Sequence, residues 1–312
     1  MTIVVTGASG HLGRLVVAGL LDQGVPASQI VAAVRTPAKA AGLAALGVQV
    51  READYDRPQT VKAALADADR VLLISGSEPG RRLEQHQAVI SAARDAGVSL
   101  LAYTSIVRAD TSPLLLAGEH QATEEAIAAA GLPFAFLRNG WYFENYGSAI
   151  AHAAATGTLT GGAGPGRVSA ASRADFAAAA VAVLTSEGQA GQVYELGGDE
   201  AWTYADLAAA ISAAAGTPVS YQDLSPEQNQ AALVAAGLPE GYAAVLADSD
   251  QGIARGDLEV RTGDLARLIG RAWPSVGHFF TTLSAAGLTG VLAVLAAGLA
   301  VGGFVAIRRV TI

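Results

Sequence analysis

Three glycines near the start of the chain constrain its fold more than any other feature. Gly7, Gly10 and Gly13 have the spacing GxxGxxG and stand between a β-branched run over 2–6 and an apolar helical pattern over 11–22. Glycine is needed where a backbone turns sharply, where it approaches a phosphate closely, and where a helix packs tightly on a strand. The N-terminus of the following helix offers N–H groups and a positive dipole to an anion. In a strand–turn–helix unit this spacing predicts a dinucleotide-binding loop rather than a plain tight turn.

The rest of the first half alternates short β-branched runs with longer helical patterns rich in Ala and Leu. Most of the short runs are continuously apolar, which is typical of strands covered on both faces. Strands are expected at 2–6, 30–35, 48–53, 70–75, 99–104 and 134–138, and helices at 11–22, 38–46, 58–67, 81–96 and 119–130. This alternation predicts an α/β fold with a doubly wound parallel sheet, the Rossmann arrangement.

The second half has a looser pattern. We expect a Rossmann domain over 1–150, to which some later segments return, and a smaller α/β substrate lobe over 151–270 at the carboxyl edge of the sheet. Glycines cluster over 157–166, which predicts loops around one or two short strands. Helical patterns recur at 173–186, 203–215 and 225–236, followed by a divergent apolar extension over 271–312.

The end of the second expected strand indicates which dinucleotide is bound. An NAD site usually has an acidic residue there, whereas this strand ends in Arg35, with Lys39 one helical turn later. Two cations suit a 2′-phosphate and favour NADP(H); the alternative is a pair of solvated basic residues at a helix entrance. Asp54 follows the third strand, where it could accept a hydrogen bond from an adenine amino group or simply serve as a turn residue.

Residues for several familiar reactions are absent. No tyrosine is followed by lysine four positions later, so the Tyr-x-x-x-Lys proton donor of ordinary short-chain dehydrogenases is missing. The lack of cysteine excludes disulfide scaffolds, thiolate nucleophiles and zinc ribbons. Five scattered histidines have no metal-ligand spacing, so no metal is expected. His120 and Glu124 lie four residues apart, and we interpret them as a pair on a helix surface.

An aromatic segment over 137–146, LRNGWYFENY, follows the sixth expected strand. It emerges at the carboxyl edge of the sheet, where open α/β folds bind ligands. Its rings could stack on a planar acceptor while Asn139 and Asn145 supply hydrogen bonds, although such a cluster can also be core packing. The candidates for the pocket that holds the acceptor are Tyr103, His120, Asn139, Trp141 and Tyr142.

Several motifs together resemble the NmrA-like, atypical short-chain dehydrogenase/reductase family, nearest to bacterial NAD(P)H:quinone oxidoreductases of the QOR2 type. They include TGASGHLG, VPASQIVAAVRTPAKA, LLISGSE, AYTSIVRADTSPL, LRNGWYFENY and SRADFAAAA, and the similarity runs from residue 1 to about 270. The resemblance implies NADP(H) bound at the pyrophosphate by Gly7, Ala8, Ser9, Gly10, His11, Leu12 and Gly13, at the 2′-phosphate by Arg35, and on the ribose and nicotinamide side by Ser75, Gly76, Ser77, Gly140, Trp141, Tyr142, Phe143, Glu144, Asn145 and Arg173. Lys39 and Thr104 are further candidates for cofactor binding.

The activity implied by the resemblance is reduction of a small-molecule quinone by direct hydride transfer from NADPH, without flavin or metal. Such a product is a stabilised hydroquinone anion that can take its proton from water, so a tuned tyrosine is dispensable. Positioning of the two planar reactants is then the main contribution of the protein. The alternative is an NADP-binding redox sensor of the NmrA-like kind, which binds the dinucleotide without turning it over.

Charge and the chain ends bear on partners and location. Twenty basic residues against 28 acidic ones give a net charge of -8, which opposes binding to nucleic acid. The N-terminus has no signal-peptide pattern, and we expect a cytoplasmic protein. Residues 283–307 carry no charge, are long enough for a membrane-spanning helix and precede Arg308 and Arg309, whose position disfavours insertion. Membrane contact through 283–307 and oligomer formation both stay open.

Overall fold

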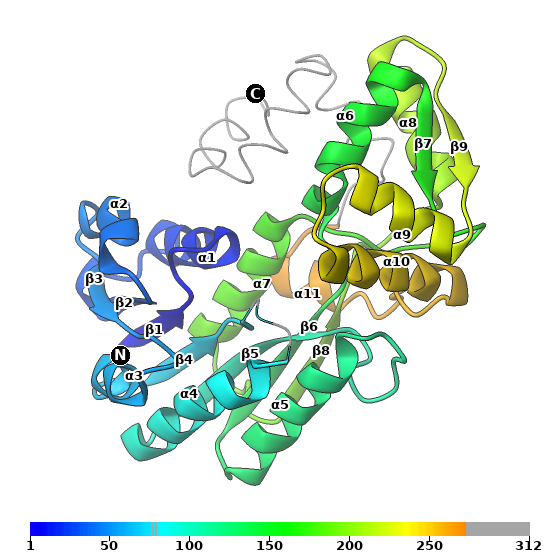
Figure 1. Ribbon diagram of the computed structural model, residues 1–312. Helices are drawn as coiled ribbons and strands as arrows, with labels where there is room; N and C mark the ends of the chain where they lie inside the picture. The colour runs from blue at the N-terminus through cyan, green and yellow to red at the C-terminus, as the bar shows by residue number, and fades with distance from the viewer. Residues whose placement is uncertain (77, 79, 273–312) are drawn as a thin grey trace.

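The protein is described by a computed structural model over residues 1–76, 78 and 80–272. Its main layer is a parallel sheet of seven strands in the order β3-β2-β1-β4-β5-β6-β8 (Figure 1). The strands of this sheet are β1 (Ile3–Thr6), β2 (Ile30–Val34), β3 (Gln49–Glu52), β4 (Arg70–Leu73), β5 (Leu100–Ile106), β6 (Phe134–Asn139) and β8 (Gln192–Leu196). The predicted doubly wound Rossmann fold is therefore confirmed.

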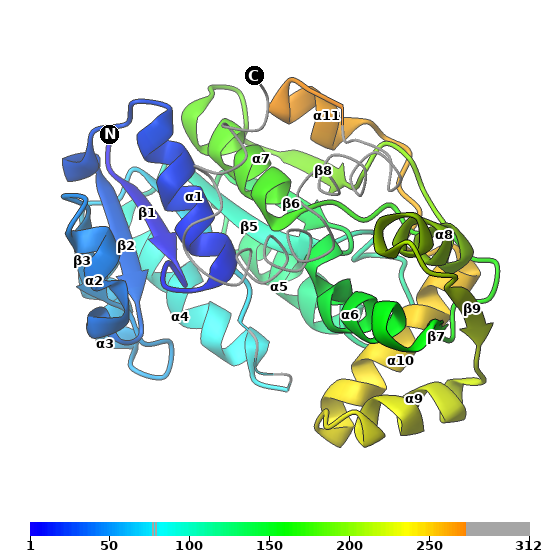
Figure 2. The same cartoon turned by 90° about the horizontal axis from the view of Figure 1, so that it is seen from above.

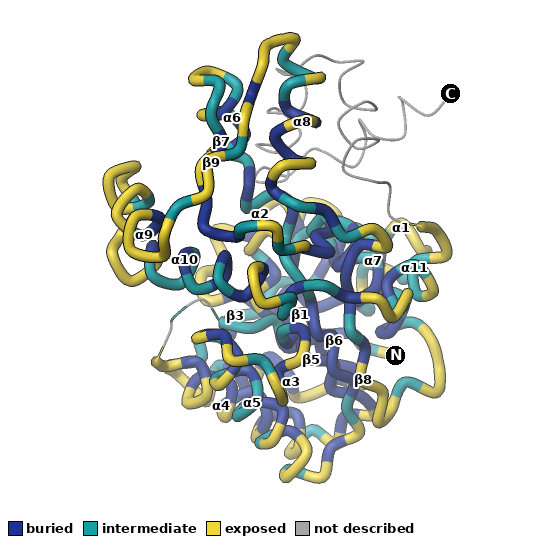
Figure 3. The backbone as a smooth tube through the Cα atoms, turned by 90° about the vertical axis from the view of Figure 1, so that its right-hand side faces the viewer, coloured by how far each residue is buried: buried dark blue, intermediate teal, exposed yellow. Residues whose placement is uncertain are grey.

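Both faces of the sheet are buried, because its central strands have no polar face. On β1, Ile3 and Val5 point into one core and Val4 points into the other. The first core lies under α1 (His11–Asp22), α7 (Arg173–Thr185) and α11 (Asp264–Ile269), and the second under α3 (Pro58–Leu65), α4 (Arg82–Ala96) and α5 (Ala117–Ala129). Figure 3 shows the strands as a buried centre surrounded by partly exposed helices. Because alternate side chains of a strand enter the two cores, the strand sequence is apolar at successive positions.

A second, smaller lobe stands over the carboxyl ends of β5 and β6 (Figures 1 and 2). It contains a two-stranded parallel sheet, and its own core includes Phe143, Trp202 and Tyr204. Its elements are η3 (Phe143–Tyr146), α6 (Gly147–Thr156), β7 (Thr158–Gly161), α8 (Tyr204–Ala215), β9 (Ser220–Asp223), α9 (Pro226–Ala235) and α10 (Glu240–Arg255).

Arg108 joins this lobe to the sheet. It follows β5, and its guanidinium donates hydrogen bonds of 2.9 and 2.8 Å to the carbonyls of Gly256 and Glu259. Its own N–H donates to Glu195 on β8, and its φ of 52° lies in the left-handed region. Three long-range hydrogen bonds therefore hold a backbone conformation that a non-glycine residue seldom adopts.

The differences from the sequence-based expectations are local. The helix expected over 38–46 is divided into η2 (Pro37–Ala40) and the short α2 (Ala41–Ala44), and α6, α10, α11 and β8 were not anticipated. Strand β8 lies at the edge of the sheet, where its first two residues are exposed, so it lacks the continuous apolar run of the inner strands. The chain after residue 150 returns to the main layer as α7, β8 and α11.

No helix within residues 1–272, apart from the two undescribed positions 77 and 79, is long and apolar enough to cross a membrane. The apolar helix expected over 283–307 lies outside the described residues. So does Ser77, one of the predicted cofactor-binding residues.

Candidate cofactor and acceptor site

The order of the strands places the candidate site. From β1 the chain moves outward to β2 and β3, whereas from β4 it moves the other way to β5 and β6. Ligands of doubly wound sheets bind at such a reversal, outside the carboxyl ends of the strands. The loops that follow β1 and β4 border this point. They are close together, since a Cβ added to Gly7 would lie 3.6 Å from the Cβ of Ile74.

The glycine loop has the geometry of a phosphate cradle. Gly7 has a φ of 59°, and the N–H of Gly10 donates a 2.9 Å hydrogen bond to its carbonyl. A Cβ on Gly13 would be 2.6 Å from both the Cα of Ala8 and the carbonyl oxygen of Gly7, so only glycine allows α1 to pack here. Helix α1 begins at His11 with no side-chain cap, which leaves its N-terminus suited to an anion. Ser9 and Leu12 complete the same turn.

The basic residues expected at the 2′-phosphate lie beside this loop. Arg35 is exposed and forms a 3.0 Å ion pair with Glu78, while Lys39 lies in η2. Arg14, which the sequence reasoning missed, donates to the carbonyls of Ser9 at 2.8 Å and Lys39 at 2.9 Å. It therefore ties the phosphate loop to the segment after β2. Its position directly after Gly13, in the first turns of α1, could have indicated this role from the sequence.

Asp54 follows β3 and has partners of its own. Its carboxylate accepts hydrogen bonds from Arg57 Nε at 3.0 Å and from the N–H of Asp56 at 3.2 Å. Burial raises the pKa of the Asp54 carboxyl, but these hydrogen bonds and the charges of Arg57 and Arg35 lower it below its ordinary value. Asp54 is thus an anion at neutral pH, held as a turn residue with its carboxylate near Arg35.

The segment after β6 and the start of α7 form one hydrogen-bonded unit. Arg173 donates to Asn145 Oδ1 at 2.9 Å, its N–H donates to the Glu144 carboxylate at 2.9 Å, and its guanidinium lies 5.0 Å from the centre of the Tyr142 ring. Burial raises the pKa of Glu144, although the charge of Arg173 opposes this shift. Gly140 is required here, because a Cβ would be 2.9 Å from the carbonyl oxygen of Leu196.

Polar atoms of this unit are buried without hydrogen bonds. Asn139 donates from Nδ2 to the Tyr142 hydroxyl at 3.2 Å, but its Oδ1 has no hydrogen-bond partner among the described residues. The same holds within that part of the chain for Trp141 Nε1 and Arg173 Nη1. Buried polar groups are normally satisfied. These three unsatisfied atoms lie at or just after the end of β6 and at the start of α7, and they mark a candidate place for the polar groups of a ligand.

The side chains of Tyr103, His120 and Phe143 are packed in the interior. Tyr103 is fully buried beneath α4 and α5, where its hydroxyl shares a 2.8 Å hydrogen bond with His120 Nδ1. Burial raises the pKa of Tyr103 and lowers that of His120, so both are neutral. The ring of Phe143 is buried in the core of the smaller lobe.

The interpretation of His120 and Glu124 as a surface pair is wrong, because both residues are buried. Glu124 instead accepts two hydrogen bonds from Arg138, at 3.0 and 2.7 Å. Arg138 also pairs with Asp110 and Glu195 and so joins α5, β6, β8 and the loop after β5. Sequence reasoning missed this network because its members are distant along the chain.

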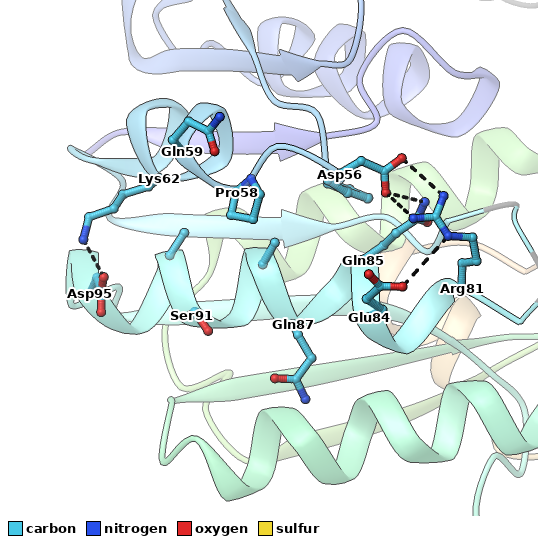
Figure 4. Close-up of a pocket in the computed structure, with 13 residues that line it drawn as sticks. Asp56, Pro58, Gln59, Lys62, Arg81, Glu84, Gln85, Gln87, Ser91 and Asp95 are labelled. Atoms are coloured by element: carbon cyan, nitrogen blue, oxygen red, sulfur yellow. Dashed lines mark hydrogen bonds and ion pairs between the residues drawn. The ribbon is translucent and has the colours of Figure 1, made fainter.

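A polar groove of about 460 Å³ opens between α3 and α4 (Figure 4). Its charged side chains already pair with one another: Arg81 with Asp56 at 2.8 Å, and Lys62 with Asp95 at 2.8 Å. The residues that line this groove do not include Asn139, Trp141 or Arg173, so it is separate from their unsatisfied polar atoms. Among the residues that the structure describes, no group of His, Asp and Glu side chains could hold a metal ion.

Comparisons with known proteins agree with this geometry. Residues 7–187 match the family model described as NAD(P)H-binding. Quinone oxidoreductase 2 of Escherichia coli (strain K12) is 49% identical over 282 residues, covering 89% of this chain and 98% of that protein. A crystal structure of the NADPH-dependent quinone oxidoreductase QOR2 from Escherichia coli, complexed with NADPH, matches with a TM-score of 0.87 at 48% identity, over 90% of this chain and 99% of that one.

A more distant relative carries the NmrA-like description. It is an NmrA-like family domain-containing oxidoreductase of Aspergillus flavus, 27% identical over 281 residues, which cover 87% of this chain and 91% of that protein. The predicted family resemblance is confirmed. The chain belongs to the NAD(P)H-binding, NmrA-like family of Rossmann-fold oxidoreductases.

Proposed function

We propose that this chain is an NADPH-dependent quinone oxidoreductase that transfers a hydride directly from the nicotinamide to a quinone. The observation that carries the proposal is the 49% identity to a quinone oxidoreductase over 89% of the chain, with the glycine loop and Arg35 in place at the strand reversal. A small-molecule quinone is the proposed partner. We further propose a cytoplasmic location. We also propose that the protein does not bind nucleic acid, because its net charge of -8 opposes association with phosphates.

The residues at the strand reversal fit NADPH. The uncapped start of α1 and the close packing at Gly13 suit the pyrophosphate, and Arg35 and Lys39 suit the 2′-phosphate. Arg14 keeps the two phosphate positions in register by binding both loops. When bound, NADPH supplies the hydride.

The segment after β6 would position the acceptor. The half-buried Trp141 would offer its ring to a planar reactant, whereas the Arg173 guanidinium lies over the ring of Tyr142 at 5.0 Å. Asn139 Oδ1 would accept a hydrogen bond from a carboxamide N–H, and Arg173 Nη1, 3.9 Å from Glu144, would donate one to a carbonyl oxygen. Arg173 and Glu144 hold this segment against α7. Such preorganisation brings the reacting atoms into attack distance, which is the main catalytic effect available to these residues.

The proposed reaction needs no protein proton donor. The quinone gains a hydride and becomes a hydroquinone anion, which then takes one proton from water. Tyr142 lies in the segment after β6, and burial raises the pKa of its hydroxyl. A proton donor for carbonyl reduction requires a lowered pKa, so Tyr142 fits an orienting role instead.

Turnover tests the proposal against the sensor alternative. Purified protein mixed with NADPH and a panel of quinones should give a quinone-dependent loss of absorbance at the reduced-nicotinamide band. Binding of NADPH with no loss for any quinone would favour the redox sensor. The absence of NADPH binding would contradict both functions.

A further inference from the structure

The loop that follows β4 is fixed by side chains rather than by the sheet. Strand β4 ends at Leu73, and the next three backbone N–H groups each donate to a side chain from a different element. The three hydrogen bonds are Ile74 to Thr6 Oγ1 at 3.1 Å, Ser75 to Thr104 Oγ1 at 2.9 Å, and Gly76 to His86 Nε2 at 3.0 Å. This set, here called the loop clamp, joins β1, β5 and α4 at the strand reversal.

The side chains of the clamp are all buried, and His86 is the only one of the three that carries a titratable ring. Its Nε2 accepts the Gly76 N–H, so the neutral ring carries its proton on Nδ1 and donates it to Thr123 Oγ1 at 3.0 Å. Thr123 in turn donates to the carbonyl of Glu119 at 2.9 Å. Burial and the charge of Arg82 lower the pKa of His86 to about 3, so the acceptor at Nε2 is present throughout the physiological range.

The carbonyl of Gly76 is held as firmly as its N–H. Arg82 lies one turn before His86 on α4. Its Nε donates a 2.9 Å hydrogen bond to the Gly76 carbonyl, and its guanidinium pairs with Glu119 at 3.2 Å. Glu119 also accepts a 2.6 Å hydrogen bond from the N–H of Gly80, at the far end of the loop. Both sides of the Gly76 backbone are therefore bound to one buried histidine–arginine pair.

We propose that His86 is a positioning residue for NADPH: by fixing Gly76 it sets the distance between the loop after β4 and the glycine loop after β1. The proposal rests on the proposed function, since it assumes that the cofactor lies between these two loops. Gly7 beside Ile74 marks their close approach. His86 itself lies beneath the loop, bonded to its backbone, and acts on the cofactor only through Gly76.

Two substitutions of His86 and one control test this role. His86→Phe fills the space but removes the acceptor, and leaving the Gly76 N–H unpaired should raise the Kd for NADPH about tenfold. His86→Gln keeps an oxygen near the Nε2 position and should restore the Kd to within about twofold. Val89→Ala, a truncation of a fully buried core side chain on the same helix, should lower the melting temperature and leave the Kd within about twofold.

The outcomes separate the inference from the proposed function. Equal Kd values for His86→Phe and Val89→Ala, measured by titration calorimetry on folded proteins, would overturn the positioning role. If His86→Phe does not fold, Thr123→Val removes the acceptor for Nδ1 and should weaken NADPH in the same direction; an unchanged Kd there would overturn the role as well. Wild-type protein that does not bind NADPH would overturn the proposed function, and the inference with it.

Discussion

At the scale of single residues, we propose that the charge directly after β2 decides between the two dinucleotides. Arg35 is exposed, and its present partner is Glu78 at 3.0 Å. A 2′-phosphate would offer the same guanidinium two or three anionic oxygens, which bind it more strongly than one exposed carboxylate. Under this proposal, selectivity for NADPH depends on an exposed residue whose only described ion pair is with Glu78.

Replacing Arg35 tests this assignment. Arg35→Ala should raise KM for NADPH about tenfold, because a charge-assisted hydrogen bond is lost, and should change KM for NADH less than about twofold. Steady-state kinetics with both cofactors measure the split. Arg94→Ala, which removes an exposed arginine near the end of α4, is the matched control for net charge. Equal weakening of both cofactors by Arg35→Ala would contradict the 2′-phosphate role.

Some residue-level features could be recognised from the sequence, and others could not, depending on whether their partners are near them along the chain. The geometry of the glycine loop and the place of Arg35 directly after β2 could be predicted from the sequence, because each depends on a few neighbouring positions. Their roles in binding NADPH stay predictions. His86 could not, since its partners Gly76 and Thr123 lie on two other parts of the chain and a lone histidine in a helix has no signal. Tyr103 and His120 show the reverse error: their residue types suggested chemistry, and burial places them in the core.

At the scale of elements, the start of α7 is bound to the segment after β6, where we propose that the acceptor lies. Ser172 caps this helix by accepting the N–H of Asp175, and Arg173 reaches from its first turn to the segment after β6. Glu144 and Arg173 are both mostly buried. Removing one partner of such a pair leaves the other charge uncompensated, which is far more costly than losing an exposed pair.

The Glu144 carboxyl makes this pair sensitive to pH. Its pKa is raised in the folded protein, so its contribution to stability is complete at low pH and is lost as pH rises through the folded-state value. Arg173→Met removes the cation that limits this rise. The variant should lose about 3 kcal/mol of unfolding free energy, with a larger loss at pH 8 than at pH 5.

Urea unfolding at pH 5 and pH 8 measures the effect. The double variant Arg173→Met with Glu144→Gln is the control, since it removes the carboxylate and should make the loss equal at the two pH values. A loss for Arg173→Met alone that does not depend on pH would mean that Glu144 is not the group responsible.

The element pattern explains how far sequence reasoning could go. Inner strands were found because burial on both faces produces continuous apolar runs. Strand β8 was missed because, at the edge of the sheet, only Tyr194 and Leu196 are buried. The polar network around Arg138 has no sequence signature, because α5, β6 and β8 supply its members separately.

At the scale of the whole molecule, the residues assigned to the site and described by the structure lie before residue 174. The curated relative of 49% identity is matched over 98% of its own length by 282 residues of this chain. The fold and activity of that relative therefore require few residues beyond the segment that the two chains share. Attachment to a membrane through 283–307 stays a prediction.

Removing the C-terminal extension tests this division of the chain. A protein that ends at Ala272 should keep kcat and KM for NADPH and quinone within about twofold, because the site and α11 are intact. The control is Leu265→Ala in the full chain, which truncates a buried α11 side chain and should cost about 2–5 kcal/mol of unfolding free energy. A large drop in activity for the shortened protein would assign a catalytic or stabilising role to 273–312.

The element order has a consequence for how acceptor preference can change. After β6 the chain enters the smaller lobe, returns as α7 and β8, enters the lobe again through α8 to α10, and returns as α11. The two parts are thus woven together by four crossings. A recombination event that cuts the gene once cannot exchange one lobe for another, and neither can a simple cassette swap in the laboratory. New acceptors should therefore be reached through point substitutions within the lobe, with the nucleotide-binding layer inherited unchanged.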